Sequence, residues 1–499
     1  MRGKGRWLSV LILVASLTAA GLSAEAKTLN FGLSGNPDSL DPHKTAGTLT
    51  FQTAKSIYDT LVEPDQSGKL VPALAEKWEV SSDELVWTFH LRKGVVFHNG
   101  DKLSAQDVKA SFVRIMDKNT ASPKAAEFKA IVSIETPDEH SLVINLKEPA
   151  APFLATLASG WAAILPKGPI ASGHDFATKP IGTGPFKLKE WVRDNRIVLV
   201  KNPGYWMKGL PRLDQVVIHV IPERSVKVQG LVSGQLHVAD IVDKDDVPTL
   251  EAGKDVTVTQ NLTSQILVMA MNCSHPVLKD PRVRQAITHA VDKQKVLDVA
   301  YGGGRPVGTF MDYSNAYYKD FTGLYPYDPD KAKKLLAEAG VKNDTALEIV
   351  VPQNYELHVK AGEMYQDMLS KVGLNVKIKL VDWSTWLSEV YKANKYDLTV
   401  IGHTGKLDPD GTLDKYGTEA RYVRWINPRA AELIENAKKI SKFENRKKLY
   451  DEALELMAKE VPFMFLGTSY RYVAFRKNVS EFRMTPNLDT FDFRWTELK

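Results

Sequence analysis

The sequence predicts an α/β protein of two or three domains. Two observations carry this prediction: an alternating strand followed by a capped helix near the start, and a regular succession of strands and helices in the second half. A chain of 499 residues is also long enough to bury several hydrophobic cores. We find no internal repeat and no low-complexity segment in it.

The strand and the capped helix follow one another closely in the sequence. Residues 85–92 alternate between apolar and polar side chains, which is typical of a half-buried strand. Asn99 and Gly100 favour a tight turn, because both residues tolerate positive φ angles. Ser104 and Asp107 then have the spacing of a capping box, and apolar residues recur after them at helical spacing.

The second half contains a β-α-β-α-β pattern. Strands are predicted at 346–352, 374–381 and 396–402, and helices at 357–372 and 384–394. This succession requires right-handed crossovers and a mostly parallel sheet. Ligands of such open sheets bind beyond the carboxyl ends of the strands, and a glycine-containing loop begins directly after residue 402. We therefore expect that loop to lie near a ligand.

The first 26 residues resemble a secretory signal peptide. Arg2, Lys4 and Arg6 precede the uncharged run 8–22, and an Ala-x-Ala cleavage pattern closes the segment at 24–26. The uncharged run is too short to span a membrane. These features predict an exported, soluble protein, with the bacterial periplasm as its compartment.

Cysteine content and charge narrow the function classes. The only cysteine is Cys273, so the cleavage point lacks a lipoprotein cysteine and no internal disulfide is expected. The 65 Lys and Arg residues nearly balance 60 Asp and Glu residues, with the two signs interspersed. This balance gives no support for nucleic-acid binding. We also expect the protein to be a monomer.

Catalytic and metal-binding motifs receive little support. No G-x-S-x-G nucleophile elbow occurs, although a secreted hydrolase remains the alternative of a different class. Asp408, Asp410 and Asp414 offer oxygen ligands, but Gly411 is misplaced for an EF-hand, and a simple turn explains Asp-Pro-Asp-Gly better. The G-x-G within 181–186 leads into a predicted strand, which disfavours a phosphate cradle. We expect neither a metal nor a cofactor.

Aromatic residues are the remaining candidates for ligand contact. Trp383 lies three residues before Trp386, so at least one of the two is expected in the core, while Trp383 could face a cleft. For Trp161 and Trp425, ligand stacking and loop anchoring are equally compatible with the surrounding residues. His403 follows an apolar strand and is either a structural histidine or a ligand contact.

Six stretches together resemble the peptide/nickel/opine family of extracytoplasmic solute-binding proteins of ABC importers, also called family 5. They occur in the order of the family and span nearly the whole chain after the signal segment. These stretches are "NPDSLDPH" (36–43), the segment 70–108, "IGTGPFKLKEW" (181–191), "NPGYW" (202–206), "DPRVRQAITHAVDK" (280–293) and "YDPDKAKKLLAEAGV" (327–341).

The resemblance implies a two-lobed periplasmic-binding-protein fold with an inserted third domain and hinge strands. Lobe I would combine 27–65, 183–272 and 477–499, the inserted small domain would cover 66–182, and lobe II would cover 273–476. The lobes would close on a solute by hinge motion and deliver it to a membrane permease. No covalent bond would be made or broken, so the resemblance implies a receptor and not an enzyme.

The resemblance also points to the loop after residue 402. In peptide-binding members an aromatic residue ends the strand, and an acidic residue three positions later pairs with the α-amino group of the peptide. Here these positions hold His403 and Lys406. If Lys406 faces the cleft, it disfavours ordinary peptides with a free amino group. It then favours an anionic or hydroxyl-rich group, as in an opine, a phosphorylated or acidic sugar conjugate, or a blocked peptide. If it faces solvent, it carries no information on the ligand. A peptide or peptide-like solute is the first expectation, and an opine or a (phospho)sugar conjugate is the alternative.

The complete set of expected ligand contacts extends beyond this loop. Thr45 to Thr48 correspond to a part of lobe I that lines the cleft through its backbone, and two tyrosines approach the last hinge crossing. A nickel or metal-chelate ligand is a further rival. The expected substrate-binding residues are Thr45, Ala46, Gly47, Thr48, Trp161, Trp383, His403, Thr404, Gly405, Lys406, Arg424, Trp425, Tyr470 and Tyr472.

Overall fold

A computed structural model of the protein describes residues 26–45, 47–485 and 490–499. Apart from Ala26, the signal segment predicted from the sequence lies outside the described residues. The expected contact residue Ala46 also lies outside them. No helix in the described part of the chain is both long and apolar enough to cross a membrane.

A mixed sheet runs through most of the molecule and confirms the predicted α/β class. Ten strands of the described residues follow one another in a main path, and two further strands, β12 (Val256–Leu262) and β14 (Gly304–Arg305), pair beside it with β18 (Phe463–Arg476). The main path, in spatial order, is β16 (Leu374–Val381), β15 (Thr345–Pro352), β17 (Leu398–Thr404), β13 (Gln265–Met271), β18 (Phe463–Arg476), β11 (Val238–Val242), β1 (Thr28–Leu33), β10 (Gln215–Val220), β9 (Arg196–Lys201) and β8 (Phe186–Val192).

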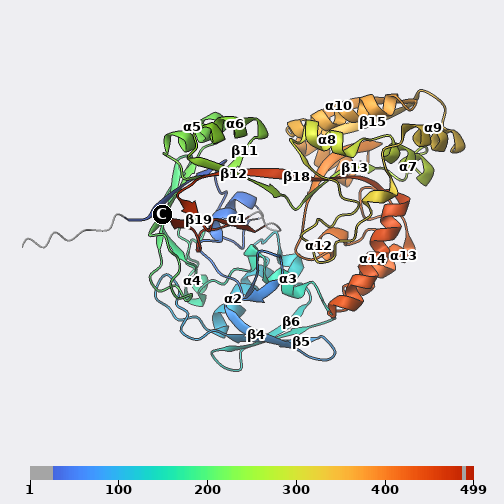
Figure 1. The fold of residues 1–499 in the computed structure, drawn as a ribbon. Helices are drawn as coiled ribbons and strands as arrows, with labels where there is room; N and C mark the ends of the chain where they lie inside the picture. The colour runs from blue at the N-terminus through green and yellow to red at the C-terminus, as the bar shows by residue number, and fades with distance from the viewer. Residues whose placement is uncertain (1–25, 46, 486–489) are drawn as a thin grey trace, which may run out of the picture.

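Strand β18 joins the two halves of this sheet. Residues 463–467 pair with β13, and residues 470–476 pair with β12, in both cases antiparallel. Figure 1 shows β18 crossing the upper part of the molecule from one body to the other. We call the body around β1 and β8 to β12 the first lobe, and the body around β13 and β15 to β17 the second lobe. They have separate hydrophobic cores, as the predicted two-lobed architecture requires.

The second lobe contains the predicted β-α-β-α-β unit. Strand β15 pairs in parallel with both β16 and β17, and α10 (Glu356–Ser370) packs on this sheet, so the parallel arrangement is confirmed. The other helices of this lobe are α7 (Pro281–His289), α8 (Lys293–Ala300), α9 (Pro329–Glu338), α11 (Trp383–Thr385), α12 (Asp410–Leu413), α13 (Pro428–Ala437) and α14 (Phe443–Glu460).

The helix predicted at 384–394 has a different geometry from the expected one. The short α11 continues into a π-helix, η5 (Trp386–Lys392). The wider π turn brings residues five positions apart together, and the rings of Trp386 and Tyr391 stack with centroids 5.9 Å apart. Trp386 is buried and donates its indole N–H to Thr399 Oγ1 at 2.9 Å, so this tryptophan is a core residue, as expected.

A small domain packs below both lobes in Figure 1. Its antiparallel sheet has the order β4 (Ala75–Val80), β5 (Val86–Leu91), β7 (Ser141–Leu146) and β6 (Ile131–Glu135). Alternate residues of β5 are buried, which confirms the predicted half-buried strand. The Ser104 and Asp107 capping box is also confirmed, since the Ser104 backbone N–H donates to Asp107 Oδ2 at 2.8 Å where α2 (Ala105–Met116) begins.

The remaining elements lie within these bodies or between them. The residue limits expected for the three domains stay a prediction. These elements are α1 (Thr48–Ala54), β2 (Val62–Pro64), β3 (Leu70–Pro72), η1 (Ala125–Phe128), α3 (Phe153–Leu157), η2 (Gly160–Ala162), α4 (Lys167–Ala171), α5 (Arg224–Ser233), η3 (Lys244–Asp246), α6 (Val247–Ala252), η4 (Thr322–Leu324), β19 (Val479–Ser480), β20 (Arg483–Thr485), β21 (Thr490–Asp492) and β22 (Glu497–Leu498).

Candidate functional site

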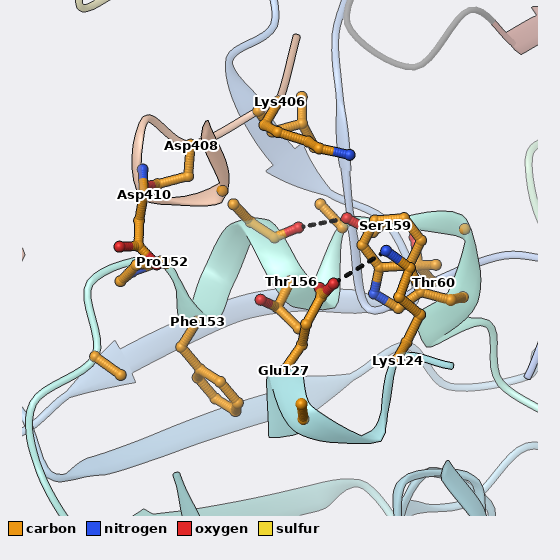
Figure 2. Close-up of a pocket in the computed structure, with 18 of the residues that line it drawn as sticks. Thr60, Lys124, Glu127, Pro152, Phe153, Thr156, Ser159, Lys406, Asp408 and Asp410 are labelled. Carbon is orange, nitrogen blue, oxygen red and sulfur yellow. Dashed lines mark hydrogen bonds and ion pairs between the residues drawn. The ribbon is translucent and has the colours of Figure 1, made fainter. Parts of the chain in front are cut away.

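A cavity of about 750 Å³ lies between the small domain and the loop that follows β17. Residues 124–161 of the small domain contribute one wall, and residues 404–415 of the second lobe contribute the opposite wall. Figure 2 shows Lys406 on one side of the cavity and Lys124 with Glu127 on the other. The cavity therefore lies beyond the carboxyl end of β17, where the sequence pattern predicted a ligand.

Thr404 at the end of β17 and the first two loop residues after it, Gly405 and Lys406, all line the cavity. Gly405 donates its backbone N–H to Ser264 O at 2.9 Å, and a Cβ atom on Gly405 would lie 2.5 Å from the same oxygen. Only glycine permits this close approach of two backbones. The contact fixes the direction in which the loop leaves the sheet and enters the cavity.

The three aspartates of the loop are paired with cations from α14 and from the residue that follows α13. Arg446 contacts both carboxylate oxygens of Asp408, with Nη2 donating to Oδ1 at 2.7 Å. Lys438 Nζ lies 2.5 Å from Asp414 Oδ1 and 3.5 Å from Asp410 Oδ1. These carboxylates thus stabilise the loop conformation. Within the described residues, no group of His, Cys, Asp and Glu side chains is arranged to hold a metal ion.

Asp410 holds its proton more tightly than an ordinary aspartate does. Burial raises the pKa of Asp410 to about 6, although the nearby Lys438 ammonium acts in the opposite direction. Its Oδ1 atom is buried and accepts no hydrogen bond from the described residues. The Asp410 carboxyl therefore changes charge at mildly acidic pH on the wall of the cavity.

Lys406 extends into the cavity and carries a charge that no described carboxylate pairs with directly. Burial among the cavity walls lowers the pKa of Lys406, and the ammonium of Lys124 lowers it further, while Glu127 raises it. Lys124 Nζ lies 3.2 Å from Glu127 Oε1 and 4.2 Å from the ring centroid of Trp161. Sequence reasoning did not find Lys124, because it lies 282 positions from Lys406 along the chain.

Trp161 lines the cavity, a position that fits ligand stacking, one of the two roles that the sequence left open beside loop anchoring. Its ring packs edge-to-face against Phe51 of α1, with centroids 5.9 Å apart, and under the Lys124 ammonium. A Cβ atom on Gly160 would lie 2.8 Å from the Phe51 ring, so the glycine lets α1 approach. The tryptophan provides an apolar and polarisable wall on which a ligand can stack.

A buried ion-pair network forms the third side of the cavity. Arg494, near the C-terminal end of the chain, pairs with Glu63 at 3.1 Å and with Asp492 at 2.5 Å, and Glu63 also pairs with Lys55 at 2.5 Å. Lys55, Asp492 and Arg494 line the cavity. No local pattern predicts this network, since Arg494 and Glu63 lie 431 positions apart.

His403 faces the hydrophobic core of the second lobe and not the cavity. Its Nε2 atom lies 2.9 Å from Tyr422 Oη, and its ring packs edge-to-face on Phe310 with centroids 5.3 Å apart. Burial lowers the pKa of His403 to about 4, with a smaller contribution from Arg421. A neutral structural histidine, one of the two readings of the sequence, matches these contacts.

Three more candidates of the second lobe lie outside the cavity wall. Trp383 stacks on Trp386 with ring centroids 5.0 Å apart and is 37% exposed. Trp425 is buried and donates its indole N–H to Glu460 Oε2 at 2.6 Å, which anchors its loop. Arg424 adopts a left-handed backbone conformation with φ of 49°.

Four candidates of the first lobe and the hinge also lie outside this wall, namely Thr45, Gly47, Tyr470 and Tyr472. Thr45 is buried and donates its hydroxyl to Asp38 Oδ2 at 2.7 Å, and Gly47 donates its backbone N–H to Thr45 Oγ1 at 2.9 Å. Thr48 begins α1. Tyr470 and Tyr472 lie on the part of β18 that pairs with β12, and Tyr472 Oη donates to Gly302 O at 2.8 Å.

Known proteins resemble this chain over nearly its whole length. The family model of the bacterial extracellular solute-binding proteins, family 5 Middle, matches residues 69–422. Di/tripeptide-binding protein 2 of Pseudomonas aeruginosa is 32% identical, with 97% of this chain and 98% of that protein covered.

Two solved structures add information on ligands. The first is AgaA of A. tumefaciens R10 in complex with agropinic acid, with a TM-score of 0.76, 29% identity, and 95% of this chain and 99% of that chain covered. The second is the ABC transporter-associated periplasmic binding protein DppA of Helicobacter pylori in complex with the peptide STSA. It has a TM-score of 0.75 and 28% identity, with 94% of this chain and 98% of that chain covered.

Proposed function

The chain belongs to the family 5 bacterial extracellular solute-binding proteins, and we propose that it is the periplasmic receptor of an ABC importer for a peptide or peptide-like solute. The observation that carries this proposal is the cavity of about 750 Å³ between the small domain and the second lobe. Its volume is that of a small-molecule site. A relative 32% identical to this chain is named a di/tripeptide-binding protein, which favours peptides.

Closure of the lobes about β18 is the proposed capture step. The solute enters an open cleft, the second lobe approaches the small domain, and the walls bury the solute between them. We propose the limits 27–65, 183–272 and 477–499 for lobe I, 66–182 for the small domain and 273–476 for lobe II. The solute leaves chemically unchanged, so the protein is not an enzyme and requires no cofactor.

An opine or a sugar conjugate is the second candidate for the ligand. Lys406 favours it, because this lysine presents a positive charge inside the cavity. AgaA, which is 29% identical to this chain, has a structure in complex with agropinic acid. Thr404, Gly405, Lys406 and Trp161 are the proposed contacts from the sequence-based set, and Lys124 and Arg494 join them.

The proposed setting is the periplasm, reached through a cleavable signal peptide at residues 1–26 without a lipid anchor. The solute is handed to an inner-membrane permease, and the receptor acts as a monomer without nucleic acid. The periplasmic setting is supported by DppA, which is described as an ABC transporter-associated periplasmic binding protein.

A retention experiment tests the proposed function. The purified protein is unfolded and refolded to remove any solute, and is then incubated with an equimolar library of dipeptides and tripeptides. After removal of unbound peptides, mass spectrometry identifies those that unfolding releases, and calorimetry measures their Kd. We expect retention of a subset with Kd near the micromolar range, about −8 kcal/mol. Retention of no peptide, together with release of a non-peptide solute from the native protein, would overturn the peptide assignment.

A further inference from the structure

We propose that Lys124 and Lys406 clasp an anionic group of the ligand between the small domain and the second lobe. This inference deepens the proposed function and rests on it. It assigns a chemical class to the bound solute, a peptide-like compound whose group in this part of the cavity is an oxyanion. It also assigns that group a role in closing the cleft.

The two lysines come from different bodies of the protein. Lys124 directly precedes η1 in the small domain, and Lys406 directly follows Gly405 in the loop after β17. Both line the cavity, and Figure 2 shows the two side chains on opposite sides of it, with Ser159 nearby. The ammonium of Lys124 contributes to the lowered pKa of Lys406, after the larger effect of burial. A group bound between them would therefore contact both bodies.

The surrounding carboxylates do not neutralise this pair. Asp408, the nearest aspartate in the loop, is held by Arg446, and Asp410 and Asp414 are held by Lys438. Glu127 Oε1 lies 3.2 Å from Lys124 Nζ. Among the described residues, Glu127 is also the only carboxylate that raises the pKa of Lys406, which burial lowers. Two ammonium groups thus share one carboxylate, which leaves one positive charge for a ligand to neutralise.

This charge arrangement couples ligand chemistry to closure. Without a solute, the approach of the second lobe brings two like charges together inside a region of restricted hydration, which opposes closure. An oxyanion attracts both lysines and is bound more strongly in the closed state than in the open one. A ligand shifts a conformational equilibrium only through such a difference in affinity. An ammonium group at the same place would add a third positive charge and keep the cleft open.

Two matched peptide libraries test the inference. One contains tripeptides with a free amino terminus, and the other contains the same tripeptides with an N-succinyl group, which replaces the ammonium by a carboxylate. Each library is offered separately to the refolded protein, retained compounds are identified by mass spectrometry, and the Kd of matched pairs is measured. We expect the succinyl compounds to bind at least about tenfold more tightly, because charge-assisted hydrogen bonds are the stronger ones.

Variants of the two lysines distinguish a direct effect on the bound oxyanion from an effect of the net charge of the protein. Lys406→Met and Lys124→Met should each remove most of the preference for the succinyl compounds, whereas Lys406→Arg should keep it. Lys118→Met serves as the control, because Lys118 is exposed on the small domain and lies outside the cavity wall. Small-angle scattering should record compaction of the wild type with the succinyl compounds, and less compaction of Lys406→Met.

The outcomes distinguish this inference from the proposed function. Equal or tighter binding of the free-amino peptides by the wild type would overturn the inference and leave a peptide receptor. A preference that survives in both methionine variants would overturn it as well. Retention from neither library would count against the proposed function, and the inference would fall with it.

Discussion

Arg446 of α14 contacts both carboxylate oxygens of Asp408, in the loop that carries Lys406. The side chain of Arg446 is 4% exposed and that of Asp408 is 13% exposed, so both charges are largely removed from water. A bidentate pair of this kind restrains the direction of the loop as well as its distance from the helix. The position of Lys406 in the cavity therefore depends on a helix that does not itself line it.

Arg446→Met should destabilise the protein strongly. It leaves the Asp408 carboxylate buried without its partner, which costs about 3 to 5 kcal/mol in comparable buried pairs. Urea unfolding followed by tryptophan fluorescence measures this loss. The double variant Arg446→Met with Asp408→Asn should recover most of the lost stability, because it removes the unpaired charge. A single variant as stable as the wild type would contradict the importance of this pair.

Gly405→Ala should weaken ligand binding more than it weakens folding. The added Cβ would lie 2.5 Å from Ser264 O, so the loop must shift and carry Lys406 with it. A displacement near 1 Å suffices to disturb a binding site, and we expect affinity to fall by about tenfold or more. Calorimetry with a retained ligand measures the change. Gly168→Ala is the matched control, since nothing lies within 4 Å of its added Cβ; an equal loss there would refute the argument.

The sequence predicted where the cavity lies better than it predicted which residues line it. The β-α-β-α-β pattern predicted a parallel arrangement of β15, β16 and β17 and therefore a ligand beyond their carboxyl ends. The end of β17 does lie beside the cavity. Strand alternation also explains His403. Thr399, Ile401 and His403 lie on one face of β17, and Ile401 belongs to the core that receives His403, so an alternation argument extended by two residues would have placed this histidine inside.

Other residues of the cavity wall were beyond sequence reasoning. Lys124 and Arg494 line the cavity from separate bodies. No spacing along the chain indicates that Lys124 lies near Lys406 or that Arg494 pairs with Glu63. Trp425 illustrates the opposite case. Its turn context suggested either stacking or anchoring, and only the partner of its indole N–H, Glu460, distinguishes the two.

Acid should destabilise the protein through its buried histidines. Burial lowers the pKa of His43 to about 4, and the pKa values of His98, His358 and His403 are lowered to about 4 in the same way. Between this value and the ordinary 6.5, the unfolded chain binds protons that the folded chain does not, so stability rises with pH. The stabilisation is complete above pH 6.5 and is lost as pH falls towards 4.

His43→Gln isolates one part of this dependence. His43 is fully buried, and its Nε2–H donates to Ala163 O at 2.9 Å, a bond that the glutamine amide can also make. A histidine whose pKa falls from 6.5 to about 4 on folding changes the free energy of unfolding by about 3 kcal/mol between pH 4 and pH 6.5. Urea unfolding across this range should therefore show a smaller slope of stability against pH in the variant. An unchanged slope would mean that His43 is protonated in the folded protein.

Glu84→Ala should weaken the closed state without touching the ligand. Glu84 lies in the turn between β4 and β5, and its carboxylate accepts hydrogen bonds from Ser441 N at 2.9 Å and Ser441 Oγ at 2.7 Å. A backbone hydrogen bond of 2.8 Å from Ala151 to Lys438 lies between the same two bodies. Both contacts join the small domain to the second lobe, so opening of the cleft must break them.

Loss of the Glu84 contacts should raise the Kd of a bound solute by about three- to tenfold, mainly through faster dissociation, as expected for one or two hydrogen bonds near the surface. Stopped-flow tryptophan fluorescence measures both rate constants. Glu79→Ala is the matched control, because Glu79 lies on β4 of the same sheet and pairs with Lys77 within the small domain. If Glu84→Ala and Glu79→Ala release the solute at the same rate, the contact between Glu84 and Ser441 does not hold the cleft closed.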